Sequence, residues 1–187
     1  MKTESNVMYI IRLAATLLII TSLVAAALAG VNAITAPAIA KLTAEKTQAA
    51  IQAVLPGGGE EMTDLPAVGY EGAELVSKAY KGENGYAIEV TPAGFDNTIT
   101  MMVGVDTEGK VLGIDIIKHT ETAGLGAVAD AETPAGQNFR GQFTGTSGSV
   151  SVTKDGGTID SITGATITSR AICAGVNAAL ACAATLG

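Results

Sequence analysis

The apolar stretch near the N-terminus constrains this chain more than any other feature. No charged residue lies between Arg12 and Lys41, and the run from Leu13 to Val31 is almost wholly apolar. A helix of that length can cross a hydrocarbon core about 30 Å thick. We therefore predict one membrane-spanning helix within an N-terminal segment, residues 1–40.

A cleaved signal peptide is the competing interpretation of this stretch. The small residues Ala27-Leu28-Ala29 before Gly30 fit a cleavage site. Because the sequence begins at Met1 with the apolar run in place, we expect the span to be retained. The flanking charges leave its orientation open, since two basic residues lie close to each end of the run.

Proline gives the next signal along the chain. Pro37 is expected to end or bend the membrane helix, because proline lacks the N–H that continues a helix. The segment Lys41 to Leu55 carries apolar residues at loosely helical spacing, which predicts a second helix. Together with the polar linker after it, this helix forms a segment that we place at residues 41–74.

The remainder, residues 75–187, is predicted to be one folded domain of the α+β class. The run Gly85 to Thr91 alternates apolar and polar residues, and two β-rich runs, Thr98 to Val105 and Val111 to Ile117, flank a Gly-ending turn. The Gly-rich region from His119 to Gly157 is expected to be mostly loop, with a short strand at Ser149 to Thr153. We predict a mainly antiparallel sheet with flanking helices.

The last predicted helix runs from Ala165 to Ala184. Its apolar lining would begin at Ile167, and Thr163 or a neighbouring hydroxyl would cap it. Cys173 and Cys182 lie nine residues apart, so on one helix they would sit about 13 Å apart on opposite faces, too far for a disulfide. We interpret both cysteines as small buried hydrophobes.

Charge and composition exclude some functions. The chain has 11 basic and 18 acidic residues, a formal charge of -7, and no basic stripe, which argues against nucleic-acid binding. The two isolated cysteines and single histidine match no zinc or iron–sulfur spacing, so no metal site is expected. There is also no GxGxxG nucleotide-binding pattern.

The segment Asp160-Ser161-Ile162-Thr163-Gly164-Ala165-Thr166 is the most specific motif. Its small residues let a bulky group approach the backbone, and the start of the following helix presents free N–H groups to an anion. A phosphate ester on the threonine hydroxyl would be stabilised there. By residue type alone, however, these hydroxyls could simply cap and solvate a helix start.

The order of residues in this segment resembles the flavinylation motif of FMN-binding domains. Such domains occur in the C subunit of Na+-translocating NADH:quinone reductase and in the G subunit of the Rnf complex, and the chain's short length is closer to the latter. The resemblance implies that Thr166 is joined to FMN through a phosphoester. It implies further cofactor-binding positions at Asp160, Thr163, Gly164, Ala165 and Thr168.

The loop from His119 to Gly126 resembles a second passage of the same domain, usually His-x-Glu-Thr-Pro-Gly-Leu-Gly, with Ala123 in place of the proline. The resemblance places four more residues beside the flavin: Glu121, Thr122, Leu125 and Gly126. Loop N–H groups and the Thr122 hydroxyl would hydrogen-bond the ring edge and tune its potential, while Leu125 would cover a ring face. The alternative is an ordinary glycine turn. We interpret His119 as structural or hydrogen-bonding rather than as a proton donor to the flavin.

The resemblance implies a function in electron transfer. A membrane-anchored subunit with covalent FMN would work within an Rnf-type complex that couples ferredoxin:NAD+ electron transfer to Na+ or H+ translocation, with no catalytic residue of its own. Its partners would be the other Rnf subunits, and a flavin transferase would attach the FMN. The soluble domain would lie on the extracytoplasmic side of the cell membrane.

Two other functions share some of these features. A flavin domain of this kind could instead feed a different extracytoplasmic reductase. A pilin-like structural protein also has a short basic N-terminus and an apolar helix. The Val31-Asn32 that follows Gly30 lacks the usual pilin processing signal, which disfavours that function.

Overall fold

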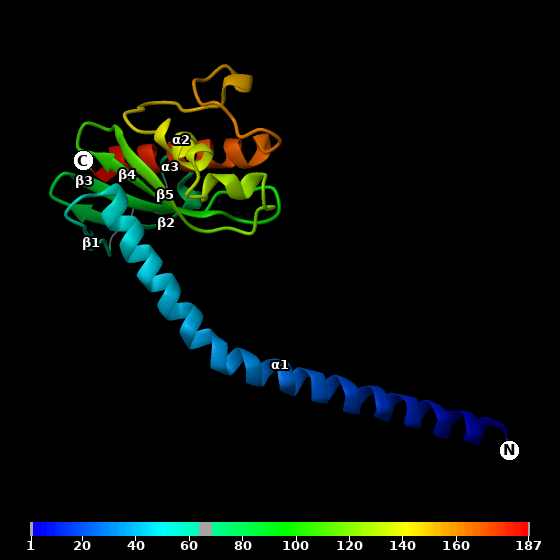
Figure 1. Ribbon diagram of the computed structural model, residues 1–187. Helices are drawn as coiled ribbons and strands as arrows, with labels where there is room; N and C mark the ends of the chain where they lie inside the picture. Colours follow the sequence, from blue (N-terminus) through cyan, green and yellow to red (C-terminus); the bar gives the residue numbers. More distant parts are fainter. Residues whose placement is uncertain (1, 64–68, 187) are drawn as a thin grey trace. The chain divides into compact units, whose positions relative to one another are not determined.

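The computed structural model describes residues 2–63 and 69–186, with side chains from residue 7 onward. The chain divides into two compact units, Met1–Ala44 and Glu45–Gly187. The three-part division at residues 40 and 74 stays a prediction. Figure 1 labels the principal elements. In chain order they are α1 (Lys2–Val54), β1 (Glu60–Glu61), η1 (Ala73–Leu75), β2 (Val76–Gly82), β3 (Gly85–Val90), β4 (Thr100–Asp106), β5 (Val111–Lys118), η2 (Gly126–Ala129), α2 (Pro134–Gly141), η3 (Thr153–Asp155) and α3 (Thr166–Leu186).

The described part of the N-terminal unit is the portion of α1 up to Ala44. Its apolar side chains are exposed, and its length and composition are sufficient for a membrane span. Hydroxyls along it bond back to their own helix: Thr21 donates to the carbonyl of Leu17 at 2.9 Å, and Thr35 donates to that of Val31 at 2.9 Å. Such bonds give each hydroxyl an acceptor, which the hydrocarbon tails of lipids do not provide.

The prediction of a separate second helix after Pro37 is wrong. The structure has one continuous helix from Lys2 to Val54, with Pro37 inside it. A proline in a helix interior removes one backbone hydrogen bond, at a cost of ~3 kcal/mol. Long apolar helices tolerate that loss because neighbouring groups compensate for it.

The domain is built on a five-stranded antiparallel sheet in the sequential order β1-β2-β3-β4-β5. The predicted hairpin is confirmed, because β4 pairs with β5 with Gly104 opposite Gly113 and Val103 opposite Ile114. Its turn has Gly109 at φ 78°. That left-handed conformation favours glycine, which is the residue that signalled the turn.

Alternation along the strands separates the sheet into two apolar faces. α3 covers one face with Ile172 and Val176, packing on residues such as Ile88 and Val103 (Figure 1). The end of α1 covers the other face, where Ile51 packs with the strand residues Tyr80, Ala87, Met102 and Ile117. The rest of this cluster comes from the end of α1 and the residue after it: Ala50, Val54 and Leu55. Successive side chains of a strand point to opposite faces, so residues of opposite parity pack on the two helices.

Both cysteines lie in α3 and are buried and unpaired, as predicted. Burial raises the pKa of the Cys173 thiol to about 11. α3 also passes the length and composition test for a membrane span, but two thirds of its apolar window is buried in the domain. It is therefore the core helix of the domain.

The region between β5 and α3 differs in part from expectation. Instead of a strand at Ser149 to Thr153, there is one isolated bridge between Val152 and Ile159, followed by η3. The short helix α2 was not predicted, although Thr133-Pro134 signals it: Thr133 is the N-cap residue, accepting a bond from Gly136 N at 3.4 Å, and Pro134 occupies the first turn.

Candidate functional site

The site begins at the N-terminus of α3. Gly164 turns the chain into the helix at φ 76°, a left-handed conformation, and a Cβ at this position would lie 2.9 Å from Leu125 Cδ2. The residue before the helix is Ala165, so the predicted hydroxyl cap is wrong: Thr163 is exposed in the preceding turn. Among the described residues, no acceptor bonds the first three backbone N–H groups of α3. They are free to bind an anion.

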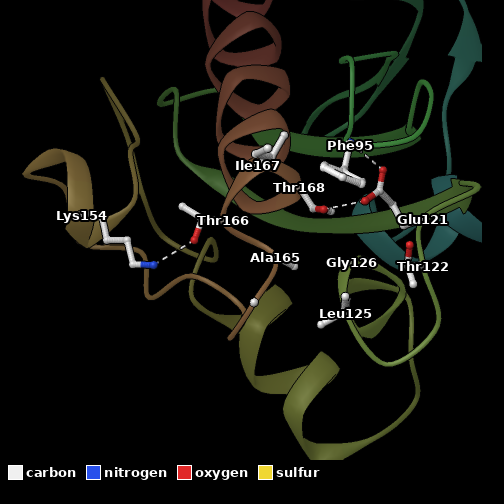
Figure 2. Close-up of a pocket in the computed structure, with 11 residues that line it drawn as sticks. Phe95, Glu121, Thr122, Leu125, Gly126, Lys154, Ala165, Thr166, Ile167 and Thr168 are labelled. Carbon is white, nitrogen blue, oxygen red and sulfur yellow. Dashed lines mark hydrogen bonds between the residues drawn. The ribbon is translucent and has the colours of Figure 1, made fainter.

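The hydroxyls at the start of α3 have very different surroundings. Thr168 is 1% exposed and donates to Glu121 Oε2 at 2.6 Å, while the fully buried Ser169 hydroxyl donates to Ala165 O and accepts from Ile162 N. Thr166 is only half-buried, and its Oγ1 accepts a bond from Lys154 Nζ at 2.9 Å. Figure 2 shows Thr166 and Thr168 projecting to different sides of the helix. Of these three hydroxyls, only that of Thr166 is available for modification.

Glu121 joins the two predicted segments. Its carboxylate is 8% exposed and accepts hydrogen bonds at both oxygens: from Phe95 N at 2.8 Å to Oε1 and from the Thr168 hydroxyl to Oε2 (Figure 2). Glycines leave room for it, because a Cβ at Gly94 or Gly126 would collide with its oxygens. The side chain therefore fastens the loop after β5 to the start of α3.

A cavity of about 280 Å³ lies between these segments. Three apolar side chains at its wall remain exposed: Phe95 at 66%, Ile167 at 50% and Leu125 at 43%. The expectation that Ile167 lines the core is therefore wrong, because it faces this opening. The complete lining is Phe95, Glu121, Thr122, Leu125, Gly126, Lys154, Gly164, Ala165, Thr166, Ile167 and Thr168.

The loop that follows Glu121 has unused hydrogen-bonding groups. Leu125 N and Ala127 N both bond to Thr122 O, at 3.1 and 3.2 Å. The N–H groups of Gly124 and Gly126 bond no acceptor among the described residues. This pattern suits the predicted donation from loop N–H groups to a ligand.

His119 stabilises the loop through two polar contacts. Its Nδ1 accepts the Glu121 N–H at 3.1 Å, and its Nε2 lies 3.5 Å from Asp130 Oδ2. An Nδ1 that accepts a bond requires the proton on Nε2, facing the carboxylate. His119 does not line the cavity, and these contacts agree with the predicted hydrogen-bonding role.

Two predicted site residues lie elsewhere. Asp160 and Thr163 line a second hollow of about 560 Å³, formed with α2 and the loop at Gly124. The Gln142 side chain holds the backbone there, accepting from Asp160 N at 2.7 Å and donating to Asp160 O at 3.2 Å. The first half of the motif is thus presented at a different opening from Thr166.

Besides Ile167, which was expected in the core, two residues of the cavity were not predicted from the sequence, Phe95 and Lys154. Phe95 lies between β3 and β4 and reaches the cavity through the Glu121 bond to its backbone, for which the sequence gives no local signal. Lys154 follows the bridge residue Val152 on η3. The Lys-Asp-Gly-Gly turn before the motif was the available signal for it.

The arrangement suits a ligand that is apolar at one end and anionic at the other. The exposed side chains of Phe95, Leu125 and Ile167 offer surfaces to a flat apolar group. At the other end, unpaired helix N–H groups and the Lys154 ammonium surround the Thr166 hydroxyl, where an anionic group would be stabilised. Among the described residues, no cluster of three or more His, Cys, Asp or Glu side chains could hold a metal.

Comparison with known proteins agrees with this chemistry. Residues 94–181 match the family model described as FMN-binding domain. The fold and the site thus define a flavin-binding domain joined to an apolar N-terminal helix.

Curated relatives show to which family of flavin-binding proteins the chain belongs. The chain is similar to the G subunit of the Na(+)-translocating ferredoxin:NAD(+) oxidoreductase complex of Acetobacterium woodii, at 31% identity over 94% of this chain and 92% of the relative. It is also similar to the G subunits of the ion-translocating oxidoreductase complexes of Methanosarcina acetivorans, at 32% over 84% and 85%, and of Yersinia pestis, at 38% over 80% and 79%. The chain belongs to the family of G subunits of ion-translocating oxidoreductase complexes.

Proposed function

We propose that this protein is the membrane-anchored electron-transfer subunit of an Rnf-type complex and that it carries FMN esterified to Thr166. The observation that carries the proposal is the position of the Thr166 hydroxyl. It lies in the wall of the cavity, at a helix N-terminus with unpaired N–H groups, whereas the neighbouring hydroxyls of Thr168 and Ser169 are buried and bonded.

Different residues of the cavity would contact different parts of FMN. Bound FMN supplies reversible acceptance and donation of electrons. Leu125, Ile167 and Phe95 would contact the ring and exclude water, and the N–H group of Gly126 would donate to its polar edge. A covalent bond to Thr166 would retain the flavin regardless of its redox state, as a relay carrier requires.

The family supports a particular complex in which this chain would work. The Acetobacterium relative is named as a subunit of a Na(+)-translocating ferredoxin:NAD(+) oxidoreductase complex. We infer that this chain passes electrons within such a complex, with the other subunits as partners, while Na+ or H+ crosses the membrane. With only two cysteines, both buried, it does not itself hold an iron–sulfur cluster.

Two further parts of the proposal concern maturation and location. A flavin transferase would move FMN from FAD onto Thr166, and α1 would anchor the chain in the cell membrane with the domain on the extracytoplasmic side. The exposed apolar surface of α1 supports the anchor.

The experiment is expression of the full chain with and without a flavin transferase, followed by denaturing gel electrophoresis under ultraviolet light. The band should fluoresce only with the transferase, because only a covalent flavin survives denaturation. Protease added to spheroplasts should degrade the domain of the membrane-bound protein. Absence of fluorescence contradicts covalent attachment, and protection from protease contradicts the proposed orientation.

A further inference from the structure

Two adjacent residues of η3 contact the first turns of α3. Lys154 Nζ donates to Thr166 Oγ1 at 2.9 Å. Asp155 accepts from Arg170 at both carboxylate oxygens, from Nε and from Nη2, each at 2.6 Å. Thr166 and Arg170 are four residues apart and therefore share a face of the helix. η3 is thus fastened to α3 at two points one helical turn apart.

The ion pair is the stronger of the two contacts. A bidentate arginine–carboxylate pair fixes both position and orientation. The hydrogen bonds that Arg170 donates to Asp155 hold the pKa of that carboxyl below its ordinary value. Because Lys154 immediately precedes Asp155 in the chain, this pair sets where the Lys154 backbone lies.

The Lys154 contact adds little to folding. Lys154 is exposed, and exposed lysine contacts contribute only ~0–1 kcal/mol to stability. The chain carries an acidic excess of 18 to 11, yet its site hydroxyl faces an ammonium group. The placement is therefore better explained by chemistry at Thr166 than by stability.

We propose that Lys154 is the cation that acts on the Thr166 oxygen during flavin attachment and neutralises the phosphodiester afterwards, and that the Asp155–Arg170 pair positions it. This inference rests on the proposed function. In the transfer, Thr166 Oγ1 bonds to the FMN-side phosphorus of FAD, the bond from that phosphorus to the bridging oxygen breaks, and AMP leaves with that oxygen. The hydroxyl proton passes to a base of the flavin transferase, since an ammonium can only donate.

The charges balance in the product. A phosphodiester between Thr166 and the flavin carries one negative charge, and Lys154 supplies one positive charge beside it. The unpaired N–H groups of α3 add the helix dipole at the same place. The same cation lowers the energy of the developing charge on Oγ1 during the transfer.

The test measures the initial rate of FMN incorporation into the full-length protein, by intact mass, with purified flavin transferase and FAD. At saturating transferase and FAD, Lys154→Gln should slow incorporation about 10- to 100-fold, the size expected for loss of a charged donor at a reacting oxygen. Lys154→Arg should retain most of the rate. Lys110→Gln makes the same charge change in the β4–β5 turn, at an exposed lysine paired with Glu108, and should leave the rate unchanged.

A double-mutant cycle tests the positioning role of the ion pair. Asp155→Asn should slow incorporation in the wild-type background but not in the Lys154→Gln background, because it acts through Lys154. Equal rates for Lys154→Gln and wild type would overturn the inference while leaving the proposed function intact. Equal losses in Lys154→Gln and Lys154→Arg, with lowered melting temperatures, would show a merely structural lysine and also overturn it. If the wild type gained no FMN, the proposed function itself would fail.

Discussion

At the scale of single residues, the hydroxyls of Thr166 and Thr168, two positions apart on α3, differ in burial and in hydrogen bonding. Thr168 is buried and completes the bonding of Glu121, whereas Thr166 is left at the cavity with a cation beside it. The residue types are identical, so burial alone separates a structural threonine from a modifiable one. Glycines at positions 94 and 126 make this possible, because any larger residue would displace the Glu121 carboxylate.

Replacing Thr168 with Val should lower the free energy of unfolding by about 1–3 kcal/mol, because a buried carboxylate oxygen loses its donor. The matched control is Thr185→Val in the same helix. The Thr185 hydroxyl donates only to its own helix, at Cys182 O, so the loss should stay below about 1 kcal/mol. Chemical denaturation of the full-length protein in detergent measures both. Equal losses would contradict a special role for the Glu121 contact.

At the scale of elements, α3 with the site packs on one face of the sheet, and the last turns of α1 pack on the other. Adjacent residues of β4 point to opposite faces: Val103 packs on the α3 side, and Gly104 lies on the side of the end of α1. A Cβ on Gly104 would collide with the backbone carbonyl of Val54 in the last turn of α1. The end of α1 is therefore part of the domain, although the same helix begins in the apolar N-terminal unit.

Gly104→Ala should destabilise the domain by about 1–3 kcal/mol, the usual cost of an overpacked contact. Gly113 is its cross-strand partner in β5, and nothing lies within 4 Å of a Cβ placed there. Gly113→Ala should therefore change stability by less than about 0.5 kcal/mol. Hydrogen exchange of β4 amides in the two variants reports the difference. Equal exchange rates would contradict the close packing of α1 on the sheet.

The elements also show what sequence can and cannot predict. The β4–β5 hairpin and α3 follow from alternation, a Gly-ending turn and a long apolar run, which are local signals. The continuous path of α1 through Pro37 and the isolated bridge at Val152 depend on environment and on contacts distant in sequence. The position of Thr166 at the cavity was predictable from its motif, and the turn at Lys154 had a local signal in Lys-Asp-Gly-Gly. Phe95 reaches the site through a backbone bond to Glu121 that no local pattern encodes.

At the scale of the whole molecule, the chain combines a helix suited to lipid with a domain suited to a flavin. A helix whose apolar side chains are exposed from Val7 to Leu42 suits an anchor that keeps a carrier among partners in the same membrane. A covalent bond would keep the flavin on that carrier. The chain belongs to the family of G subunits of ion-translocating oxidoreductase complexes, which agrees with an anchored domain that binds flavin.

The central claim is that Thr166 is the residue that carries FMN, and intact mass measures it most directly. After expression with a flavin transferase, the wild-type chain should gain the mass of one FMN less one water, and Thr166→Ala should gain none. Thr163→Ala is the control, because Thr163 is the other threonine of the motif and lines a different hollow, and this variant should still be labelled at Thr166. An increment that persists in Thr166→Ala, or a wild type that gains no mass, would contradict the claim.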